Sequence, residues 1–319
     1  MIVQAAPPTD TRSHEPAYLG LYRRGELAER ARSAVDHLVA CDLCARYCRV
    51  DRRTSARGAV CRTGRYALVA SYGPHHGEER PLRGRGGSGT IFFGACNLRC
   101  VFCQNWQISQ SAAGAPVDAR RLAAMMLDLQ RMGCHNINLV SPSHVVAQVL
   151  EALPLAADAG LRVPLVYNTG GFDSLEALAL LDGVVDIYMP DLKYAADDVA
   201  RRHSRVRGYV AANQAVVREM HRQVGDLVLD DDGVAVRGLL VRHLVLPGDL
   251  AGTADVLAFL AREISPDTYV NLMPQYRPCY RAAEYSPLDR PLAPSEFAAA
   301  LAAARACGLR RLDPECVRA

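Results

Sequence analysis

Short apolar runs alternate with longer segments of helical spacing between Thr90 and about Tyr280. The short runs are rich in β-branched and aromatic residues, whereas the longer segments place apolar residues three and four positions apart. The runs cover residues 89–94, 136–140, 163–167, 185–189, 239–246 and 268–273, and helices are expected over 119–132, 145–157 and 251–264. This alternation predicts parallel strands joined by right-handed crossovers. Six strands fit a partial barrel better than a closed eight-stranded one.

The chain divides into three predicted parts. Residues 1–85 are rich in arginine, proline and glycine and form a small cysteine-rich N-terminal unit with its linker. Residues 86–283 form the barrel, and residues 284–319 form a helical tail with an alanine-rich helix over 294–307. At 319 residues and 50% hydrophobic content the chain can bury a large core. The predicted fold class is therefore α/β, a partial (β/α)6 TIM-like barrel with a small cysteine-rich N-terminal unit.

Composition excludes several classes of protein. No run approaches the roughly 18 to 20 apolar residues of a membrane span, and residues 1–20 lack the basic start and apolar centre of a secretion signal. We therefore expect a cytoplasmic protein without a membrane partner. Eleven cysteines in such a chain indicate metal ligands and buried thiols rather than disulfides. A net charge of +3 is too small to predict a nucleic-acid binder.

Three cysteines follow the first predicted strand at x3 and x2 spacing, namely Cys96, Cys100 and Cys103. Three thiolates can hold three irons of a four-iron, four-sulfur (4Fe-4S) cluster and leave the fourth iron open for a ligand, whereas an electron-relay cluster normally has four protein ligands. The loop leaves the C-terminal end of its strand, where active sites of parallel β/α folds are built. A structural zinc loop is the alternative. The context favours chemistry at iron.

Four more cysteines form a second group in the N-terminal unit. They are Cys41, Cys44, Cys48 and Cys61. Four thiolates complete a coordination sphere, which fits an auxiliary iron-sulfur cluster and a structural zinc site equally well. Seven arginines between residues 46 and 65 surround this group. They predict either a docking patch for an acidic electron donor or a solvated surface.

Polar residues follow the predicted strands at the same end as the cysteine loop. The candidates for binding a cofactor are Phe102, Ser141, Ser143, His144, Asn168, Thr169, Asp191, Lys193, Arg242 and Gln275. Lys193 is the only lysine beside 36 arginines, which indicates a site that needs a compact ammonium group. A surface ion pair is the alternative for Lys193, and a helix-capping role is the alternative for His144. Either Arg242 or its neighbour His243 must face the barrel interior, because strand neighbours alternate.

These motifs together resemble the radical S-adenosylmethionine (SAM) superfamily, in which such a cysteine loop follows the first barrel strand. The runs 73–79, 87–93 and 96–109 are similar to the branch of relatives of pyruvate formate-lyase activating enzyme. The likeness extends from Cys41 to about Pro278. The chain differs from that superfamily in having Ser141-Pro142-Ser143-His144 where many members have a Gly-Gly-Glu segment. It also lacks the ferredoxin-like insertion of some glycyl-radical activases, since no cysteine lies between Cys103 and Cys134.

The resemblance implies a mechanism and roles for several residues. SAM would chelate the open iron, an electron would come from a flavodoxin or ferredoxin type donor, and cleavage would give a 5'-deoxyadenosyl radical that abstracts hydrogen from a small molecule or peptide. We assign Lys193 to the SAM carboxylate, and Asp191 to a ribose hydroxyl or to orienting Lys193. The candidates for proton transfer in the substrate cavity are His75, His76, Glu78 and Glu79.

Two other functions remain open. In one, the chemistry is the same but the substrate is a backbone glycine of a glycyl-radical enzyme, which would then be a protein partner. In the other, the chain is a zinc or iron-sulfur binding module without catalytic activity, for example a redox sensor.

Overall fold

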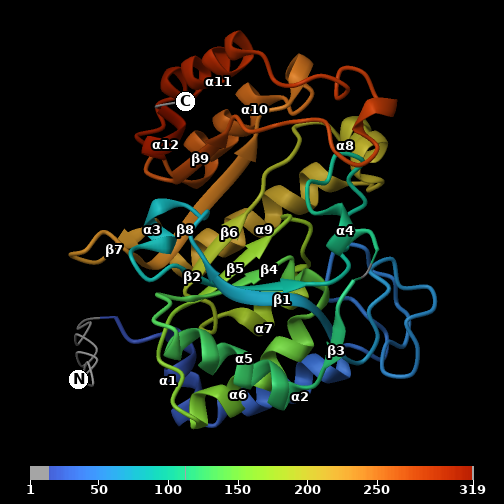
Figure 1. Cartoon of the computed structure of the whole chain (residues 1–319), viewed down its shortest axis with the longest axis vertical. Helices are drawn as coiled ribbons and strands as arrows, with labels where there is room; N and C mark the ends of the chain where they lie inside the picture. The colour runs from blue at the N-terminus through green and yellow to red at the C-terminus, as the bar shows by residue number, and fades with distance from the viewer. Residues whose placement is uncertain (1–13, 112, 318–319) are drawn as a thin grey trace, which may run out of the picture.

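The computed structural model describes residues 14–111 and 113–317, so the first 13 residues of the predicted N-terminal unit and the last two of the predicted tail lie outside the described residues. A twisted sheet has β10 at one edge and β3 at the other. Figure 1 shows this sheet crossing the molecule from β9 to β3. Its strands are β1 (Ala67–His75), β2 (Ser88–Phe93), β3 (Ala115–Val117), β4 (Ile137–Val140), β5 (Leu165–Thr169), β6 (Ile187–Pro190), β7 (Val228–Leu229), β8 (Ala235–Leu244), β9 (Tyr269–Met273) and β10 (Arg311–Leu312).

The six predicted strands form the central part of this sheet, and the predicted fold class is confirmed. They lie side by side and parallel in the order β9-β8-β6-β5-β4-β2. Alternation along β4 points Ile137 and Leu139 into the core beneath the helices, so Asn138 between them faces the concave side. That concave side, which we call the lumen, is lined near its base by Val166, Ile187 and Leu240.

Helices cover most of the convex side of the sheet. The described helices are α1 (Ala17–Arg23), α2 (Glu26–Asp36), α3 (Arg80–Arg83), α4 (Trp106–Ser109), α5 (Ala119–Arg131), α6 (Val146–Asp158), α7 (Leu175–Leu181), α8 (Asp197–Ser204), α9 (Tyr209–Val224), α10 (Thr253–Phe259), α11 (Pro294–Ala306) and α12 (Pro314–Val317). The short helix α3 lies instead on the open side of the lumen. The predicted helices correspond to α5, α6, α10 and α11, and α10 continues as a π-helical turn to Ile264. No described helix has the length and hydrophobicity needed to cross a membrane.

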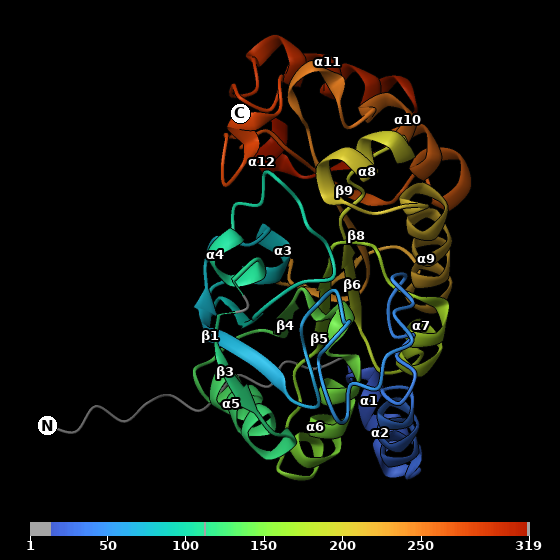
Figure 2. The same cartoon turned by 90° about the vertical axis from the view of Figure 1, so that its right-hand side faces the viewer.

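Helices α1 and α2 belong to the layer that covers the barrel. Figure 2 shows α2 beside α6, where Tyr18, Leu27 and Leu38 are completely buried in the same hydrophobic core as the barrel strands. The Tyr18 hydroxyl also donates to the Val163 carbonyl at 3.1 Å. Sequence analysis did not predict these helices. The boundary near residue 85 stays a prediction, although residues 14–38 share the barrel's core.

Strand β1 was also not predicted, and it extends the sheet by pairing antiparallel with β2. Its C-terminal end therefore lies beside the N-terminal end of β2. Residues 76–87, which include α3, then cross toward the far edge of the partial barrel. Glu79 accepts a hydrogen bond from Asn271 of β9 at 2.7 Å, and Arg83 pairs with Glu315 at 2.7 Å. This segment therefore bridges the open side of the lumen.

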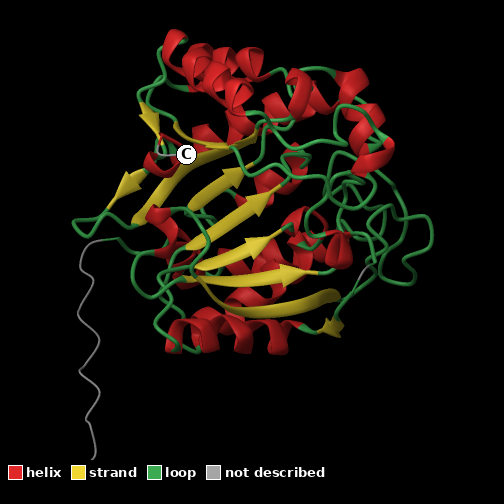
Figure 3. Ribbon diagram, turned by 45° about the horizontal axis from the view of Figure 1, so that its top comes forward, coloured by secondary structure: helices red, strands yellow, loops and turns green. Residues whose placement is uncertain are grey.

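Loops gather at the C-terminal ends of the parallel strands, where the arrows of Figure 3 end. The long irregular segment between α2 and β1 lies at this edge too, where Arg46 donates to the Arg205 carbonyl just after α8 and Arg62 donates to the Gln110 carbonyl just after α4. The Phe172 carbonyl, just after β5, accepts hydrogen bonds from Ala45 of that segment and from Asn97 of the cysteine loop. The fold thus brings both cysteine groups to one end of the barrel.

Candidate functional site

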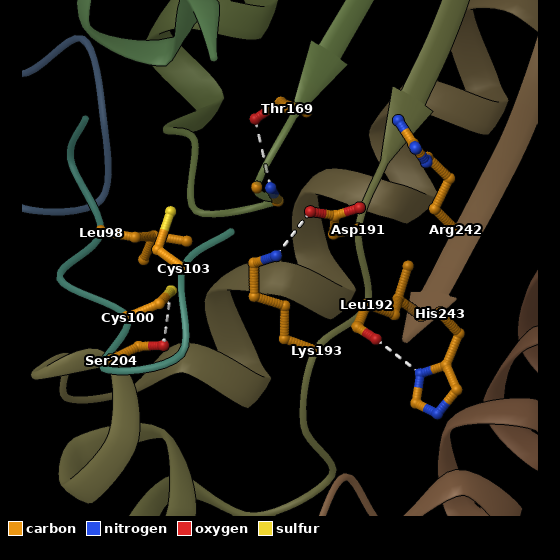
Figure 4. A network of polar contacts seen from close by, with 12 residues as sticks. Leu98, Cys100, Cys103, Thr169, Asp191, Leu192, Lys193, Ser204, Arg242 and His243 are labelled. Atoms are coloured by element: carbon orange, nitrogen blue, oxygen red, sulfur yellow. Dashed lines mark hydrogen bonds and ion pairs between the residues drawn. The ribbon is translucent and has the colours of Figure 1, made fainter. Parts of the chain in front are cut away.

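The loop that carries Cys96, Cys100 and Cys103 leaves β2 and is held against the end of α8. The backbone amides of Arg99 and Val101 donate to the carbonyls of Ser204 and His203 at 3.1 and 2.8 Å. Cys100 Sγ lies 2.9 Å from Ser204 Oγ, as Figure 4 shows. Backbone pairing on one side and a hydroxyl contact on the other fix the orientation of this loop.

The three cysteines of the loop are chemically suited to an iron-sulfur cluster. All three are free thiols in or near the protein interior. Burial raises the pKa of Cys96 to about 12, and the charges of Cys100 and Cys103 contribute to that shift. Thiolates so placed require a compensating positive charge, which a metal cluster supplies.

Among residues 14–111 and 113–317, no group of three or more histidine, cysteine, aspartate or glutamate side chains is arranged to hold a metal ion. A 4Fe-4S cluster does not need its ligands to converge on one ion, since each thiolate binds a different iron. The residues that would hold it are Cys96, Cys100 and Cys103.

Asp191 and Lys193 stand at the end of β6, opposite the cysteine loop (Figure 4). Lys193 Nζ lies 2.5 Å from Asp191 Oδ2. Burial by itself would lower the pKa of Lys193, but Asp191 and then Cys100 raise it above its usual value, so the ammonium stays charged. The side chains of Lys193 and Asp191 remain 18% and 22% exposed, which leaves them accessible from the mouth of the barrel.

Two residues of α9 that sequence analysis missed fix the backbone around this pair. The Tyr209 hydroxyl accepts from the Lys193 amide at 3.0 Å, and it lies 3.2 Å from the carbonyls of both Gly170 and Asp191. Asn213 Nδ2 donates to the carbonyls of Gly171 and Asp191 at 2.9 and 3.1 Å. These contacts span long sequence separations, so no local signal could have identified them.

The glycine pair after β5, Gly170 and Gly171, allows two neighbouring loops to approach closely. Gly171 has a φ of +72°, and a Cβ there would lie 2.1 Å from Asn213 Nδ2 and 2.4 Å from the Asp191 carbonyl oxygen. A Cβ at Gly170 would lie 2.7 Å from Leu98 in the cysteine loop. The β5 turn is therefore packed between the cysteine loop and the Asp191 turn.

Strand β8 directs Arg242 into the lumen and His243 outward. Of these two neighbours, Arg242 is therefore the one that faces the barrel interior. His243 Nδ1 lies 2.6 Å from the Leu192 carbonyl, and Nε2 lies 3.0 Å from Thr253 Oγ1. Burial lowers the pKa of His243 to about 4, so the ring is neutral at physiological pH. His243 thus holds the peptide unit between Leu192 and Lys193.

The candidates after β4 and β5 lie deeper than those after β6. Ser143 Oγ and Thr169 Oγ1 are 2.9 Å apart, and Thr169 also donates to Asp173, a buried carboxylate that sequence analysis missed. His144 Nε2 lies 3.0 Å from the Gly94 carbonyl, and burial lowers the pKa of this histidine to about 4. These contacts are consistent with a role in holding the loops. Two further candidates lie nearby, Ser141 in left-handed conformation and Asn168 on the lumen side of β5.

Phe102 and Gln275 lie on the side of the mouth formed by the last strand. The Phe102 ring makes edge-to-face contacts with Tyr194 and Tyr276, with centroids 6.4 and 6.1 Å apart. The Gln275 carbonyl accepts a hydrogen bond from Gln104 Nε2 at 3.2 Å. Phe102 is thereby part of an aromatic wall behind the cysteine loop.

The acidic candidates of the 76–87 segment meet Arg242 in the lumen. Arg242 Nε lies 3.1 Å from Glu79 Oε1, and Arg242 Nη1 lies 3.7 Å from Glu78 Oε2. His75 Nδ1 lies 3.2 Å from Glu78 Oε1. His76 is not part of this group, because it is exposed and its ring lies against Gly87.

The second cysteine group surrounds a buried arginine. Arg52 Nη1 lies 3.3 Å from Cys41 Sγ, and its charge interacts with Cys61, Cys41 and Cys44. A second arginine, Arg46, joins this group to the other cysteine loop. Its Nε donates to the Asn97 carbonyl at 2.8 Å, and Cys44, Cys48 and Cys96 all act on its charge. The two cysteine groups are therefore neighbours.

Comparison with known proteins agrees with this geometry. The family model described as "Radical SAM superfamily" matches residues 90–229. The Methanocaldococcus jannaschii protein named "Uncharacterized protein MJ0674" is 32% identical over 271 residues, which cover 82% of this chain and 73% of that protein. The chain belongs to the radical SAM superfamily. Membership implies a 4Fe-4S cluster and SAM as its cofactors, and the three loop cysteines are suited to such a cluster.

Solved structures of radical SAM proteins are also similar, at low identity. A radical SAM methyltransferase from Sphaerobacter thermophilus has a TM-score of 0.46 and 15% identity over 70% of this chain and 64% of its own. Streptococcus suis SuiB, solved with its precursor peptide SuiA, has a TM-score of 0.43 and 11% identity over 68% of this chain and 46% of its own. This chain thus spans less than two thirds of either structure.

Proposed function

We propose that this protein reductively cleaves SAM at a 4Fe-4S cluster and uses the resulting radical to abstract hydrogen from a small molecule or peptide. When bound, the cluster and SAM together supply the 5'-deoxyadenosyl radical. The observation that carries the proposal is the arrangement of the barrel mouth, where a buried three-cysteine loop faces the Lys193–Asp191 pair. The runs 73–79 and 87–93 support placement in the branch of relatives of pyruvate formate-lyase activating enzyme.

Lys193 would hold the carboxylate of SAM. It is charged, partly accessible, and close enough to the cysteine loop to interact with Cys100. Asp191 orients it through their 2.5 Å contact, while Tyr209 and Asn213 fix the backbone on which both stand. A rigid point charge of this kind positions a ligand more accurately than a flexible surface side chain does.

The barrel supplies the enclosure that radical chemistry requires. Beneath the mouth, the lumen is lined by buried apolar side chains such as Val166, Ile187 and Met189. The 76–87 segment bridges its open side through the contact between Glu79 and Asn271. Such walls keep water and unwanted hydrogen donors away from the reacting groups.

The N-terminal cysteines would hold a second metal centre. Four thiols, all free, stand on one loop, and Cys41, Cys44 and Cys61 are buried around Arg52. Arg46 lies between this group and the cluster loop, which places a second centre beside the first. An auxiliary iron-sulfur cluster there would form a route for electrons, whereas zinc would only stabilise the loop.

A flavodoxin or ferredoxin type donor would dock on the same loop. Arg49, Arg57 and Arg62 are exposed around the second cysteine group, and such donors are acidic proteins. We expect the rate of electron delivery to fall as ionic strength rises, because surface charges are screened within about 8 Å at physiological salt.

The decisive test is anaerobic reconstitution with iron and sulfide, followed by reduction in the presence of SAM. Formation of 5'-deoxyadenosine supports the proposal. Absence of this product from protein that holds the cluster would contradict it and favour a metal-binding module without catalytic activity. Abstraction from a backbone glycine would instead give a glycyl radical signal when the protein is mixed with a glycyl-radical enzyme.

A further inference from the structure

The lumen below Asp191 contains a group of charged side chains that SAM binding does not require. Glu78 and Glu79 are 7% and 4% exposed, and both approach Arg242. We call Glu78, Glu79 and Arg242 the lumen cluster. The charge of Asp191 also acts on Arg242, and the backbones of the two residues pair in a parallel β-bridge. The lumen cluster therefore begins directly beneath the proposed SAM site.

Several oxygen atoms in this part of the lumen have no hydrogen-bond partner. Glu78 Oε2 and Glu79 Oε2 are both buried and form no hydrogen bond, and the ion pair of Glu78 Oε2 with Arg242 Nη1 is long, at 3.7 Å. Asn138 is completely buried, faces the lumen from β4, and leaves both Oδ1 and Nδ2 unpaired. Unpaired buried polar atoms are rare in folded proteins, because each loses its hydrogen bonds to water without replacement. Their concentration on one concave surface indicates a ligand that pairs with them.

The unpaired atoms define the chemistry of that ligand. Two of them, Glu78 Oε2 and Glu79 Oε2, are acceptors of the lumen cluster, whereas Asn138 on β4 offers an unpaired donor, Nδ2, as well as an unpaired acceptor, Oδ1. Two buried nitrogens beside the carboxylates, Arg242 Nε and His75 Nδ1, also lack hydrogen-bond geometry, but both already lie within 3.2 Å of a carboxylate oxygen. A primary ammonium group has three donors and no acceptor, which complements the two carboxylate oxygens.

The charges of the cluster favour the same class of ligand. Two carboxylates face one guanidinium, and His75 Nδ1 lies 3.2 Å from Glu78 Oε1. With both carboxylates and the guanidinium ionised and the His75 ring neutral, the cluster carries one excess negative charge, while Asp191 and Lys193 offset each other. Burial raises the pKa of Glu78, Arg242 opposes that shift, and Glu79 adds to it. A buried carboxylate in excess is costly unless a cation compensates it. A substrate cation would supply the missing charge.

We propose that the lumen cluster binds the primary ammonium group of the substrate, which is therefore an amine such as an amino acid, a polyamine or a lysine side chain of a peptide. This inference rests on the proposed function, because it places that amine below the SAM site. The ammonium group anchors the substrate and is not itself consumed. The carbon that loses hydrogen lies on the part of the substrate that extends toward the mouth.

The experiment follows deuterium from substrate to 5'-deoxyadenosine. A metabolite extract from cells grown on deuterated medium is separated by cation exchange, and half of each fraction is treated with an amine-acetylating reagent. Each fraction is then incubated anaerobically with reconstituted enzyme, SAM and dithionite. We expect deuterated 5'-deoxyadenosine only from cationic fractions, with at least a tenfold loss after acetylation. Label from anionic or neutral fractions, label that survives acetylation, or no label from any fraction would overturn the inference.

Unlabelled 5'-deoxyadenosine separates failure of this inference from failure of the proposed function. If unlabelled 5'-deoxyadenosine forms without any deuterated product, the protein cleaves SAM but the proposal that its substrate is an amine is wrong. If none forms in any incubation, the proposed function itself fails.

Variants test the residues directly. In Glu79→Gln, and separately in Glu78→Gln, the ratio of deuterated to total 5'-deoxyadenosine should fall at least tenfold, and the substrate concentration at half saturation should rise. The matched control is Glu263→Gln, which removes an exposed carboxylate that pairs with Arg218 on the outer surface. Iron content and thermal unfolding identify a glutamate variant that fails to fold. If one of the two fails, the label ratio of the other glutamate variant tests the inference. Unchanged ratios in both folded variants would overturn the inference.

Discussion

The two cysteine loops lie at the same end of the barrel but are built differently. The loop of Cys96, Cys100 and Cys103 continues a central strand and is pinned by backbone hydrogen bonds to α8. The loop of Cys41, Cys44, Cys48 and Cys61 has no regular secondary structure. Backbone hydrogen bonds within the loop, such as that from the Cys41 amide to the Val50 carbonyl at 3.1 Å, shape it. The buried Arg52 side chain donates to the Thr63 carbonyl at 2.7 Å and ties the loop to the barrel by donating to the His144 carbonyl at 2.6 Å.

This difference indicates different tasks. A loop fixed by the sheet can present an open coordination site in a constant orientation to Lys193. A loop fixed by arginines and, on our proposal, by its own metal can close that metal's coordination sphere and bring it near the first centre. The following predictions test this division, beginning with the largest expected effect.

Cys100→Ala should abolish SAM cleavage, with a loss of about 1,000-fold or more, because removal of one of three ligands destroys the cluster. The rate of 5'-deoxyadenosine formation measures this effect. The matched variant Cys134→Ala removes a thiol beyond both loops and should retain cleavage. Near-normal cleavage by Cys100→Ala would show that the ligand assignment is wrong.

Lys193→Ala should weaken SAM binding by roughly 10- to 100-fold, since a hydrogen bond to a charged group contributes about 1.5–3 kcal/mol. Lys193→Arg should recover only part of this loss, because a planar fork replaces a point charge. The concentration of SAM at half-maximal spectral change of the reduced cluster gives the measurement. Equal affinity in Lys193→Ala and the wild type would remove Lys193 from the SAM site.

Cys44→Ala should remove the second metal and leave the first. With an auxiliary cluster, iron should fall from about eight to about four atoms per chain; with a structural zinc, about one zinc should be lost and iron should stay at about four. Elemental analysis of reconstituted protein distinguishes the two cases. If neither metal changes, the N-terminal cysteines do not bind one.

Acidification should destabilise the metal-free protein between about pH 6.5 and pH 4. His243 and His144 are buried with pKa values lowered to about 4, so the unfolded chain binds more protons in this range and stability falls as the pH falls. Each histidine accounts for up to about 3 kcal/mol. His243→Gln should reduce the slope of unfolding free energy against pH, as measured by urea denaturation. An unchanged slope would contradict the assignment.

Arg46→Gln should have the smallest effect, a loss of about 1–2 kcal/mol in unfolding free energy, because two arginine hydrogen bonds to carbonyl groups disappear. It should also speed amide hydrogen exchange in residues 41–61. Arg53→Gln, an exposed arginine that pairs only with its neighbour Asp51, provides the control. The same exchange rates in both variants would mean that Arg46 does not join the two loops.

Much of the fold followed from local patterns. Six strands and four helices were predicted close to their observed positions, because a buried strand or an amphipathic helix leaves its period in the sequence. Helices α1 and α2 and strand β1 were missed. Arginines, glycines and cysteines interrupt the apolar pattern of their segment, and the core that buries Tyr18 and Leu27 comes from residues far along the chain.

The sequence by itself determined the chemistry: three cysteines at x3 and x2 spacing after a strand, one lysine among arginines, and a second group of four thiols. Only the tertiary structure decided which polar groups meet. Tyr209 and Asn213 reach the Asp191 turn from α9, and Glu79 reaches Arg242 across the open side of the barrel. The types of ligand that a chain offers are properties of single residues and their spacing. Which side chains meet in the lumen depends instead on strand register and on the path of the 76–87 segment. Both are fixed by the packing of the whole core.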